Sequence, residues 1–183
     1  MQSLRGSFLI ATRQMPDPRF SRQVVYICVH SEEGAMGVAV NQPAQISFSE
    51  VLRLAQIEEK VERDWPPVYI GGPVEMERAL FLYSSDYNLD NCLTVTSQTR
   101  ITSDGQILTD IAAGHGPESF LFMLGYAGWG PGQLENELTM QGWLVVPGDV
   151  DILFNTPDDL KWRQAAEKYG IDIALFNDEP GLA

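Results

Sequence analysis

The chain has 183 residues, of which 44% are hydrophobic and 20% charged, so its composition is that of a folded globular protein. A formal net charge of −13 disfavours direct binding to nucleic acid, because affinity for phosphates comes largely from lysine and arginine. No apolar run approaches the ~20 residues of a membrane span, and no secretory signal pattern opens the sequence. We therefore expect one cytoplasmic domain over residues 1–183, with a tail that frays from about residue 177.

The chain has only two cysteines, and its basic residues are concentrated near the N-terminus. Cys28 and Cys92 are too few for a disulfide framework, so we expect two reduced, buried thiols. The first 22 residues contain one acid, Asp17, and a basic strip of four arginines: Arg5, Arg13, Arg19 and Arg22. This strip can meet an acidic partner, but pairing within the acidic remainder of its own fold is the simpler interpretation.

Strands dominate the first part of the chain. β-Branched and aromatic residues predict strands over 7–12 and 23–30, and a third strand over 35–40 makes a hairpin with a four-residue loop, 31–34. The spacing of Ser47 and Glu50 is that of a capping box, which predicts a helix running to about Ile57.

Elements alternate irregularly after that helix. We predict strands over 68–70, 79–83, 92–96 and 143–146, with the first of them broken by Gly71-Gly72-Pro73. A second capping box at Ser103 and Gln106 predicts a helix that Gly114 closes, and Thr156 begins a helix over about 157–169. Runs of strands with interspersed helices favour an α+β fold with a mixed or antiparallel sheet.

A glycine-rich segment, Gly125–Leu138, is the most distinctive part of the sequence. Glycine is needed where φ is positive or where a second backbone comes too close for a Cβ. The spacing of its glycines matches neither a dinucleotide-binding fingerprint nor a P-loop, and Glu135 and Glu137 would repel a phosphate. We therefore interpret the segment as a packing device; Trp129 within it and Trp143 beyond it are core or interface residues.

Few residues have the pattern of a catalytic or metal site. Cys28 and His30 share a strand face and could form a thiolate–imidazole pair, but a buried thiol beside a strand-end histidine fits as well. His115 follows a helix end on a glycine-flanked loop, where it is a base, a ligand or simply a loop residue. The acid pairs Glu135/Glu137 and Asp149/Asp151 could hold magnesium, but a solvated acidic face is the simpler interpretation. We predict no catalytic residue, no metal and no cofactor.

Arg78 lies just after the glycine-glycine-proline turn. A guanidinium at such a turn could clamp a carboxylate or phosphate with two hydrogen bonds. It could equally pair with Glu75 or Glu77 within its own segment. Both interpretations remain open from the sequence.

Four blocks of sequence occur in a fixed order along the chain. They are Gly6–Thr12 with Met15, Asp17-Pro18 and Phe20; His30 with Gly34–Val38, Asn41 and Pro43; Tyr69–Val74; and Gly125–Leu138. In this order and spacing the chain resembles the bacterial AlgH/YqgE family over nearly its whole length. The resemblance implies an α+β fold whose mixed, mostly antiparallel sheet curls into a pseudo-barrel with peripheral helices. It implies no established activity, cofactor or catalytic residue, and a regulatory label that comes from association with transcriptional control of alginate synthesis.

The chain departs from the family pattern at three positions. Arg13 stands where proline is common, Gln42 where arginine is common, and Tyr83 where histidine is frequent. If the arginine and histidine serve a ligand in the family, that ligand site is altered here.

Three functions follow from these observations. The leading one is a regulatory or interaction module that acts without catalysis through a protein partner or small ligand. We expect its binding surface where six residues converge: His30, Asn41, Gly71, Gly72, Pro73 and Arg78. His115 is a further candidate for this surface. The second is a hydrolase or transferase using His30 or His115 with Arg78. The third is a DNA-binding regulator, which the mixed charges of the helices disfavour.

Overall fold

The computed structural model describes residues 1–12, 14–20 and 22–172. These residues pack as two compact units, one of residues 38–127 and one that combines the described residues of 1–37 with residues 128–172. The α+β class with a mostly antiparallel sheet, as predicted, is confirmed. That the chain is one domain stays a prediction. The structure of Arg13 and of the tail from residue 177 lies outside the described residues.

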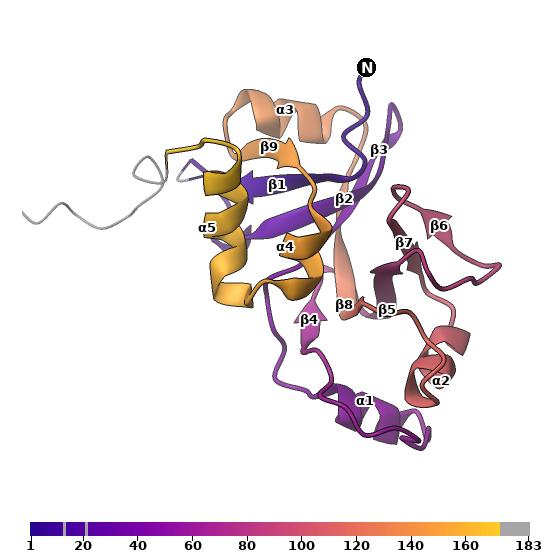
Figure 1. The fold of residues 1–183 in the computed structure, drawn as a ribbon. Helices are drawn as coiled ribbons and strands as arrows, with labels where there is room; N and C mark the ends of the chain where they lie inside the picture. Colours follow the sequence, from indigo (N-terminus) through magenta and orange to yellow (C-terminus); the bar gives the residue numbers. More distant parts are fainter. Residues whose placement is uncertain (13, 21, 173–183) are drawn as a thin grey trace, which may run out of the picture. The chain divides into compact units, whose positions relative to one another are not determined.

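The first unit is built on strands in the order β3-β2-β1-β9 (Figure 1). β1 pairs antiparallel with both β2 and β9, and Phe8 lies opposite Tyr26 on one side and Val146 on the other. The strands are β1 (Ser7–Ala11), β2 (Val24–Ser31), β3 (Gly34–Ala39) and β9 (Trp143–Pro147). The helices are η1 (Pro18–Phe20), α3 (Gln133–Thr139), α4 (Val150–Asn155) and α5 (Asp158–Lys168).

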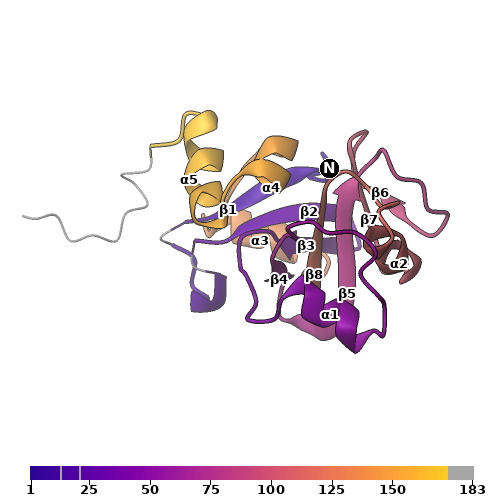
Figure 2. The same cartoon turned by 60° about the horizontal axis from the view of Figure 1, so that its bottom comes forward.

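The second unit has the strand order β6-β7-β5-β8, with β4 parallel to β8. Its strands are β4 (Val68–Ile70), β5 (Val74–Ser84), β6 (Leu93–Thr94), β7 (Thr99–Thr102) and β8 (Phe120–Trp129), the last of which runs on into the first unit. Its helices are α1 (Phe48–Leu54) and α2 (Gln106–Ala112). α1 lies in front of β5 and β8 in Figure 2, and Phe48 contacts the rings of Phe120 and Phe122 in an aromatic core.

Helix boundaries test the capping predictions. The Ser47 hydroxyl accepts from the Glu50 N–H at 3.1 Å and begins α1, as predicted. The predicted capping box at Ser103 is wrong, because the Asp104 carboxylate accepts from the Gln106 N–H at 2.9 Å instead. The helix over 158–168 was predicted almost to its bounds, whereas α4 was not predicted at all.

Two further expectations need correction. The β2–β3 loop contains only residues 32 and 33, because Ser31 and Gly34 belong to the strands. Cys28 is buried, which raises the pKa of its thiol to about 12 by desolvation, but Cys92 is only partly buried. Among the described helices, none has the length and apolar character needed to cross a membrane.

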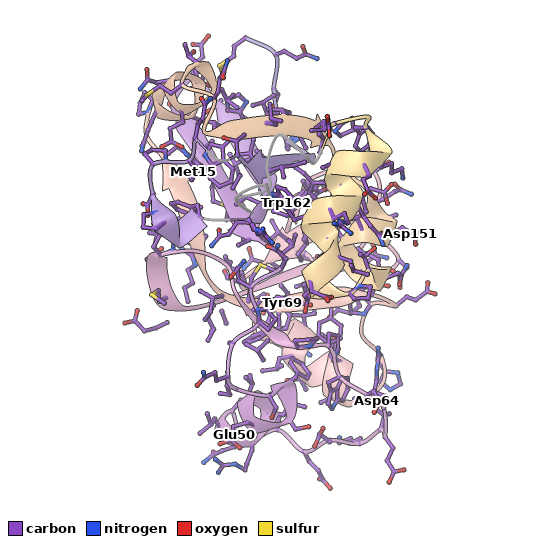
Figure 3. All side chains as sticks on the ribbon, turned by 90° about the vertical axis from the view of Figure 1, so that its left-hand side faces the viewer. Met15, Glu50, Asp64, Tyr69, Asp151 and Trp162 are labelled. Atoms are coloured by element: carbon purple, nitrogen blue, oxygen red, sulfur yellow. The ribbon has the colours of Figure 1, made fainter. Side chains whose placement is uncertain are left out.

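α5 packs on β1 through a face that includes Trp162, labelled in Figure 3, whose Nε1–H donates to the Ala11 carbonyl at 3.1 Å. Its neighbour Lys161 is 1% exposed, and its Nζ lies 3.0 Å from Asp158 Oδ1. Burial lowers the pKa of Lys161 from 10.5, and the hydrogen bond to Asp158 opposes this change only in part. The helix thus carries a lysine whose charge is costly to bury.

This buried lysine predicts how stability depends on pH. Between the lowered pKa of the folded state and about 10.5, the unfolded chain binds more protons, so stability rises with pH in that window. Below the lowered pKa, Lys161 is protonated in both states and adds no slope. We expect the unfolding free energy of the wild type, relative to that of Lys161→Met, to increase as pH rises through the window. Urea titrations at successive pH values measure this difference. A gap that stays constant would show that Lys161 titrates alike in both states.

Candidate interaction site

The glycine-glycine-proline turn after β4 is shaped by a close approach of two backbones. A Cβ on Gly71 would lie 2.3 Å from the Gly125 carbonyl oxygen, and a Cβ on Gly72 would lie 2.2 Å from the Tyr126 carbonyl carbon. Any other residue at these positions would clash with main-chain atoms of β8. Two of the distinctive sequence blocks therefore pack directly against each other inside the second unit.

Next to this contact, β5 leaves its regular pairing with β8. Val74 pairs with Tyr126 and Ala79 with Leu124, so that residues 75–78 stand opposite Gly125 alone. Glu75 has a φ of 46°, which a residue with a side chain adopts only when surrounding structure enforces it. We call residues Pro73–Arg78 the β5 bulge. Bulges of this kind redirect side chains and are common beside functional sites.

Glu75 holds the bulge together. Its carboxylate accepts from the Tyr126 hydroxyl and lies 3.3 Å from Nη1 of Arg78. The Tyr126 bond and then the Arg78 bond lower the pKa of Glu75, and the same contact with Glu75 raises the pKa of Tyr126. Of the two interpretations of Arg78, pairing within its own segment is the one present, although half of its side chain stays exposed.

The β5 bulge also presents its side chains to solvent. All six of its residues are exposed, and two of them carry large hydrophobic side chains: Met76 at 52% and Val74 at 36%. Within the described part of the chain, the Glu77 carboxylate makes no side-chain hydrogen bond or ion pair. A rigid frame thus carries an apolar centre with an acidic side chain beside it.

The predicted surface residues fall in both units. Gly71, Gly72, Pro73 and Arg78 come together in and beside the β5 bulge. Asn41 is half-buried on the segment that joins β3 to this region, where the Ala39 N–H donates to the Gly71 carbonyl at 2.7 Å and the Ile70 N–H to the Gln42 carbonyl at 2.8 Å. His115 is exposed beyond α2, with its N–H bonded to the Asp110 carbonyl at 2.8 Å.

His30 belongs to the first unit, where both of its ring nitrogens have partners. Nδ1 accepts from the Leu4 N–H at 2.9 Å, which leaves Nε2 to carry the proton and donate to Glu135 at 2.6 Å. This hydrogen bond lowers the pKa of Glu135. The side chain of His30 is only 2% exposed, so it ties the N-terminal segment to α3. Its convergence with Arg78 stays a prediction.

The glycine-rich segment ends in a second packing device. Glu137 on α3 accepts from Nε1 of both Trp129 and Trp143, each at 2.9 Å, and the two indole rings meet edge to face. Both indoles are buried, at 7% and 1% exposed. The two tryptophans are therefore part of the core of this unit.

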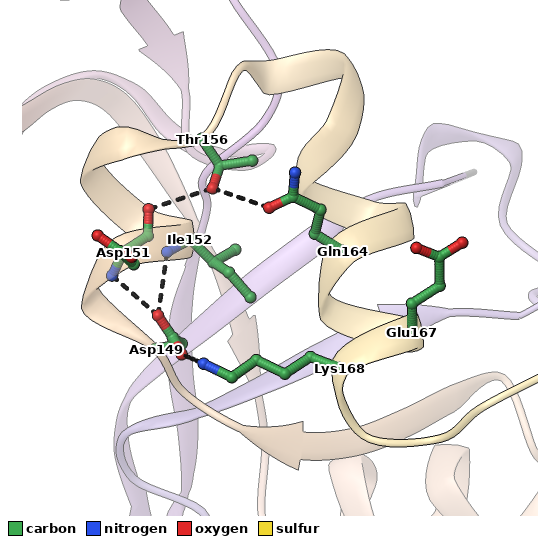
Figure 4. A pocket seen from close by; sticks show the side chains of 7 residues that line it. All are labelled: Asp149, Asp151, Ile152, Thr156, Gln164, Glu167 and Lys168. Carbon is green, nitrogen blue, oxygen red and sulfur yellow. Dashed lines mark hydrogen bonds and ion pairs between the residues drawn. The ribbon is translucent and has the colours of Figure 1, made fainter.

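Two small clefts have polar walls whose groups bind one another. The cleft between α4 and α5, of about 290 Å³, is shown in Figure 4. There Asp149 caps α4 by accepting from the Asp151 and Ile152 N–H groups, and it also pairs with Lys168. The other, about 380 Å³ beside α1, contains the Arg53–Glu50 ion pair. Within the described residues, no group of three His, Cys, Asp or Glu is placed to hold a metal ion.

Comparison with known proteins assigns this chain to a family. Residues 8–174 match the model of the AlgH-like family. The chain is 44% identical over 183 residues to the UPF0301 protein DP2218 of Desulfotalea psychrophila, covering 99% of this chain and 95% of that one. The chain therefore belongs to the AlgH-like family.

Solved structures show the same fold. The solution structure of the AlgH protein from Pseudomonas aeruginosa is 36% identical, with a TM-score of 0.78, and the match covers all of both chains. The crystal structure of DIP2367 from Corynebacterium diphtheriae, 21% identical, gives a TM-score of 0.74 over 92% of this chain and 88% of that one, a likeness of fold alone. The family resemblance inferred from the sequence blocks is confirmed.

Proposed function

We propose that this protein is a non-catalytic interaction module of the cytoplasm that binds a protein partner through the β5 bulge. One observation carries the proposal: six consecutive exposed residues are held in an irregular backbone by glycine packing and by the Glu75 network. Binding residues are commonly loops or bulges that a rigid scaffold positions. An ordered segment also loses little conformational entropy when a partner binds.

The polar residues that an enzyme would need are engaged elsewhere. His30 uses one ring nitrogen as acceptor and the other as donor, and Arg78 pairs with Glu75. The hydrolase or transferase alternative therefore depends on His115, which is exposed and lies beyond α2. For the DNA-binding alternative, Lys161 is buried and Arg163 and Lys168 lie near acids, which supports a partner other than nucleic acid.

The methionine at the centre of the bulge gives a direct test. Met76→Ser removes its apolar side chain, and Met140→Ser makes the same change at a methionine 60% exposed on the surface of the other unit. Both variants should unfold within about 0.5 kcal/mol of the wild type, because the sites are exposed. We expect the wild type and Met140→Ser to retain one protein near unit stoichiometry from a lysate of the host, and Met76→Ser to retain at least about tenfold less.

Two results would count against the proposal. Equal recovery of that protein by both variants would place the contact away from the bulge. Recovery of no protein by the wild type would favour a small ligand, for which His115 and Arg78 would be the next residues to replace.

A further inference from the structure

We propose that the partner meets the β5 bulge with a basic segment, which covers Met76 and places a lysine or arginine against Glu77. This inference rests on the proposed function, since it names the chemistry of the partner at the same surface. It follows from the charge that the bulge leaves unpaired, from the electrostatic field around it and from the exposed apolar side chains of the patch.

The net charge that the bulge presents to a partner depends on which of its charged side chains pair with one another. Arg78 is the one basic side chain between residues 73 and 78, and its Nη1 lies 3.3 Å from Glu75 Oε2. Glu75 also accepts from the Tyr126 hydroxyl, so these three groups neutralise and hold one another. The charge left for a partner is the carboxylate of Glu77, which is exposed and has no partner within the described residues. An anionic ligand would meet repulsion here.

The wider field has the same sign. Residues 38–127 contain twelve acidic and five basic side chains, and the whole chain carries −13. A field of this kind attracts basic partners over a distance of about 8–10 Å at physiological salt and speeds their association. It also repels a second copy of the same chain, which makes self-association through this face unfavourable.

The apolar part of the patch suits a segment with an apolar side of its own. Met76 and Val74 together give an exposed apolar centre beside the acid. Interfaces commonly pair an apolar core with a polar rim, and methionine adapts its shape to the surface it meets. Gly71, Gly72 and Gly125 hold the backbone beneath, so the patch is ordered before the partner arrives.

A photoreactive side chain can identify what lies over the bulge. Benzoylphenylalanine is placed at position 76 of the full chain, and in a matched bait at position 140, and each is irradiated in a lysate of the host. We expect a position-76 adduct whose cross-linked peptide contains lysine or arginine within a few residues. Its yield should fall at least about fivefold when Glu77→Lys is added and in roughly 0.5 M NaCl, because salt screens exposed charges.

A second exposed glutamate controls for net charge. Glu118→Lys changes the charge of the same unit by the same amount outside the bulge, and it should reduce the yield less than about twofold. A specific adduct at position 76 whose peptide lacks basic residues, or whose yield Glu77→Lys leaves unchanged, would overturn the basic-partner inference and leave the interaction module standing. Absence of any adduct above the position-140 bait would overturn both.

Discussion

Gly72→Ala is expected to lower the unfolding free energy by about 3 kcal/mol or more. The new Cβ would lie 2.2 Å from the Tyr126 carbonyl carbon and 2.4 Å from the Ala127 amide nitrogen. Main-chain atoms of a central strand cannot rotate aside as a side chain can, so β4 and β8 must separate. Urea denaturation followed by circular dichroism measures the loss.

The matched control for this change is Gly105→Ala. Gly105 is the N-cap of α2 and has a φ of −66°, and a Cβ there would meet no other group within 4 Å beyond its chain neighbours. Alanine should leave stability unchanged or raise it by up to about 1 kcal/mol, because it restricts the unfolded chain. If Gly72→Ala were as stable as Gly105→Ala, the close packing of the turn on β8 would not exist in solution.

Glu137→Ala is expected to destabilise the protein by about 3 kcal/mol. The substitution leaves the Nε1–H groups of Trp129 and Trp143 without an acceptor, and an unpaired buried donor costs about 1–3 kcal/mol. Glu137→Gln keeps one carbonyl oxygen and should lose less. Tryptophan fluorescence reports the change directly, since two of the four tryptophans share this acceptor.

Asn136→Ala serves as the control on the same helix. Asn136 is exposed on α3, and among the described residues its side chain donates to the Met140 sulfur alone, at 3.8 Å. Its replacement should change stability by less than about 0.5 kcal/mol. Equal stabilities for the Glu137 and Asn136 variants would mean that water satisfies both indoles and that Glu137 is dispensable for the fold.

Much of the secondary structure could be predicted because local signals decide it. Apolar runs indicate β1 and β2. The start of α1 is set by a local hydrogen bond, which the Ser47 hydroxyl accepts from the Glu50 N–H three residues later. α4 was missed since it has only six residues, too few to show a period, and its cap comes from Asp149. At α2, Ser103 has the spacing of a capping residue, but Asp104 accepts the hydrogen bond from the Gln106 N–H instead. The local sequence pattern does not distinguish these two possible acceptors.

The candidate site was predictable only in part, because it depends on contacts between distant residues. The sequence indicated that the glycines serve close packing, but not that Gly71 and Gly72 meet Gly125 and Tyr126. From the sequence, His30 is a candidate for binding a ligand or partner. In the structure its side chain is instead hydrogen-bonded to Glu135, which lies 105 residues away in the chain. The positive φ of Glu75 is likewise enforced by the surrounding fold, and no local propensity for it exists in glutamate.

The same glycine packing connects fold and proposed function. β8 contacts the turn at Gly71 and Gly72 and, through Tyr126, also bonds Glu75 in the bulge. A mutation that separates β4 from β8 should therefore disturb the bulge as well as stability. By contrast, a change at Met76 or Glu77 should leave the fold intact and alter binding alone, since both side chains are exposed.

The most direct test maps the bound partner on the protein by amide chemical shifts. The ¹⁵N-labelled chain is titrated with the partner protein recovered by the wild type, or with the peptide that cross-links at position 76. A partner that binds the β5 bulge will shift the amides of residues 74–78 and of Gly125 and Tyr126, and leave those of α4 and α5 unchanged. Shifts centred instead on His115 or on the α4–α5 cleft would contradict the bulge as the interaction site.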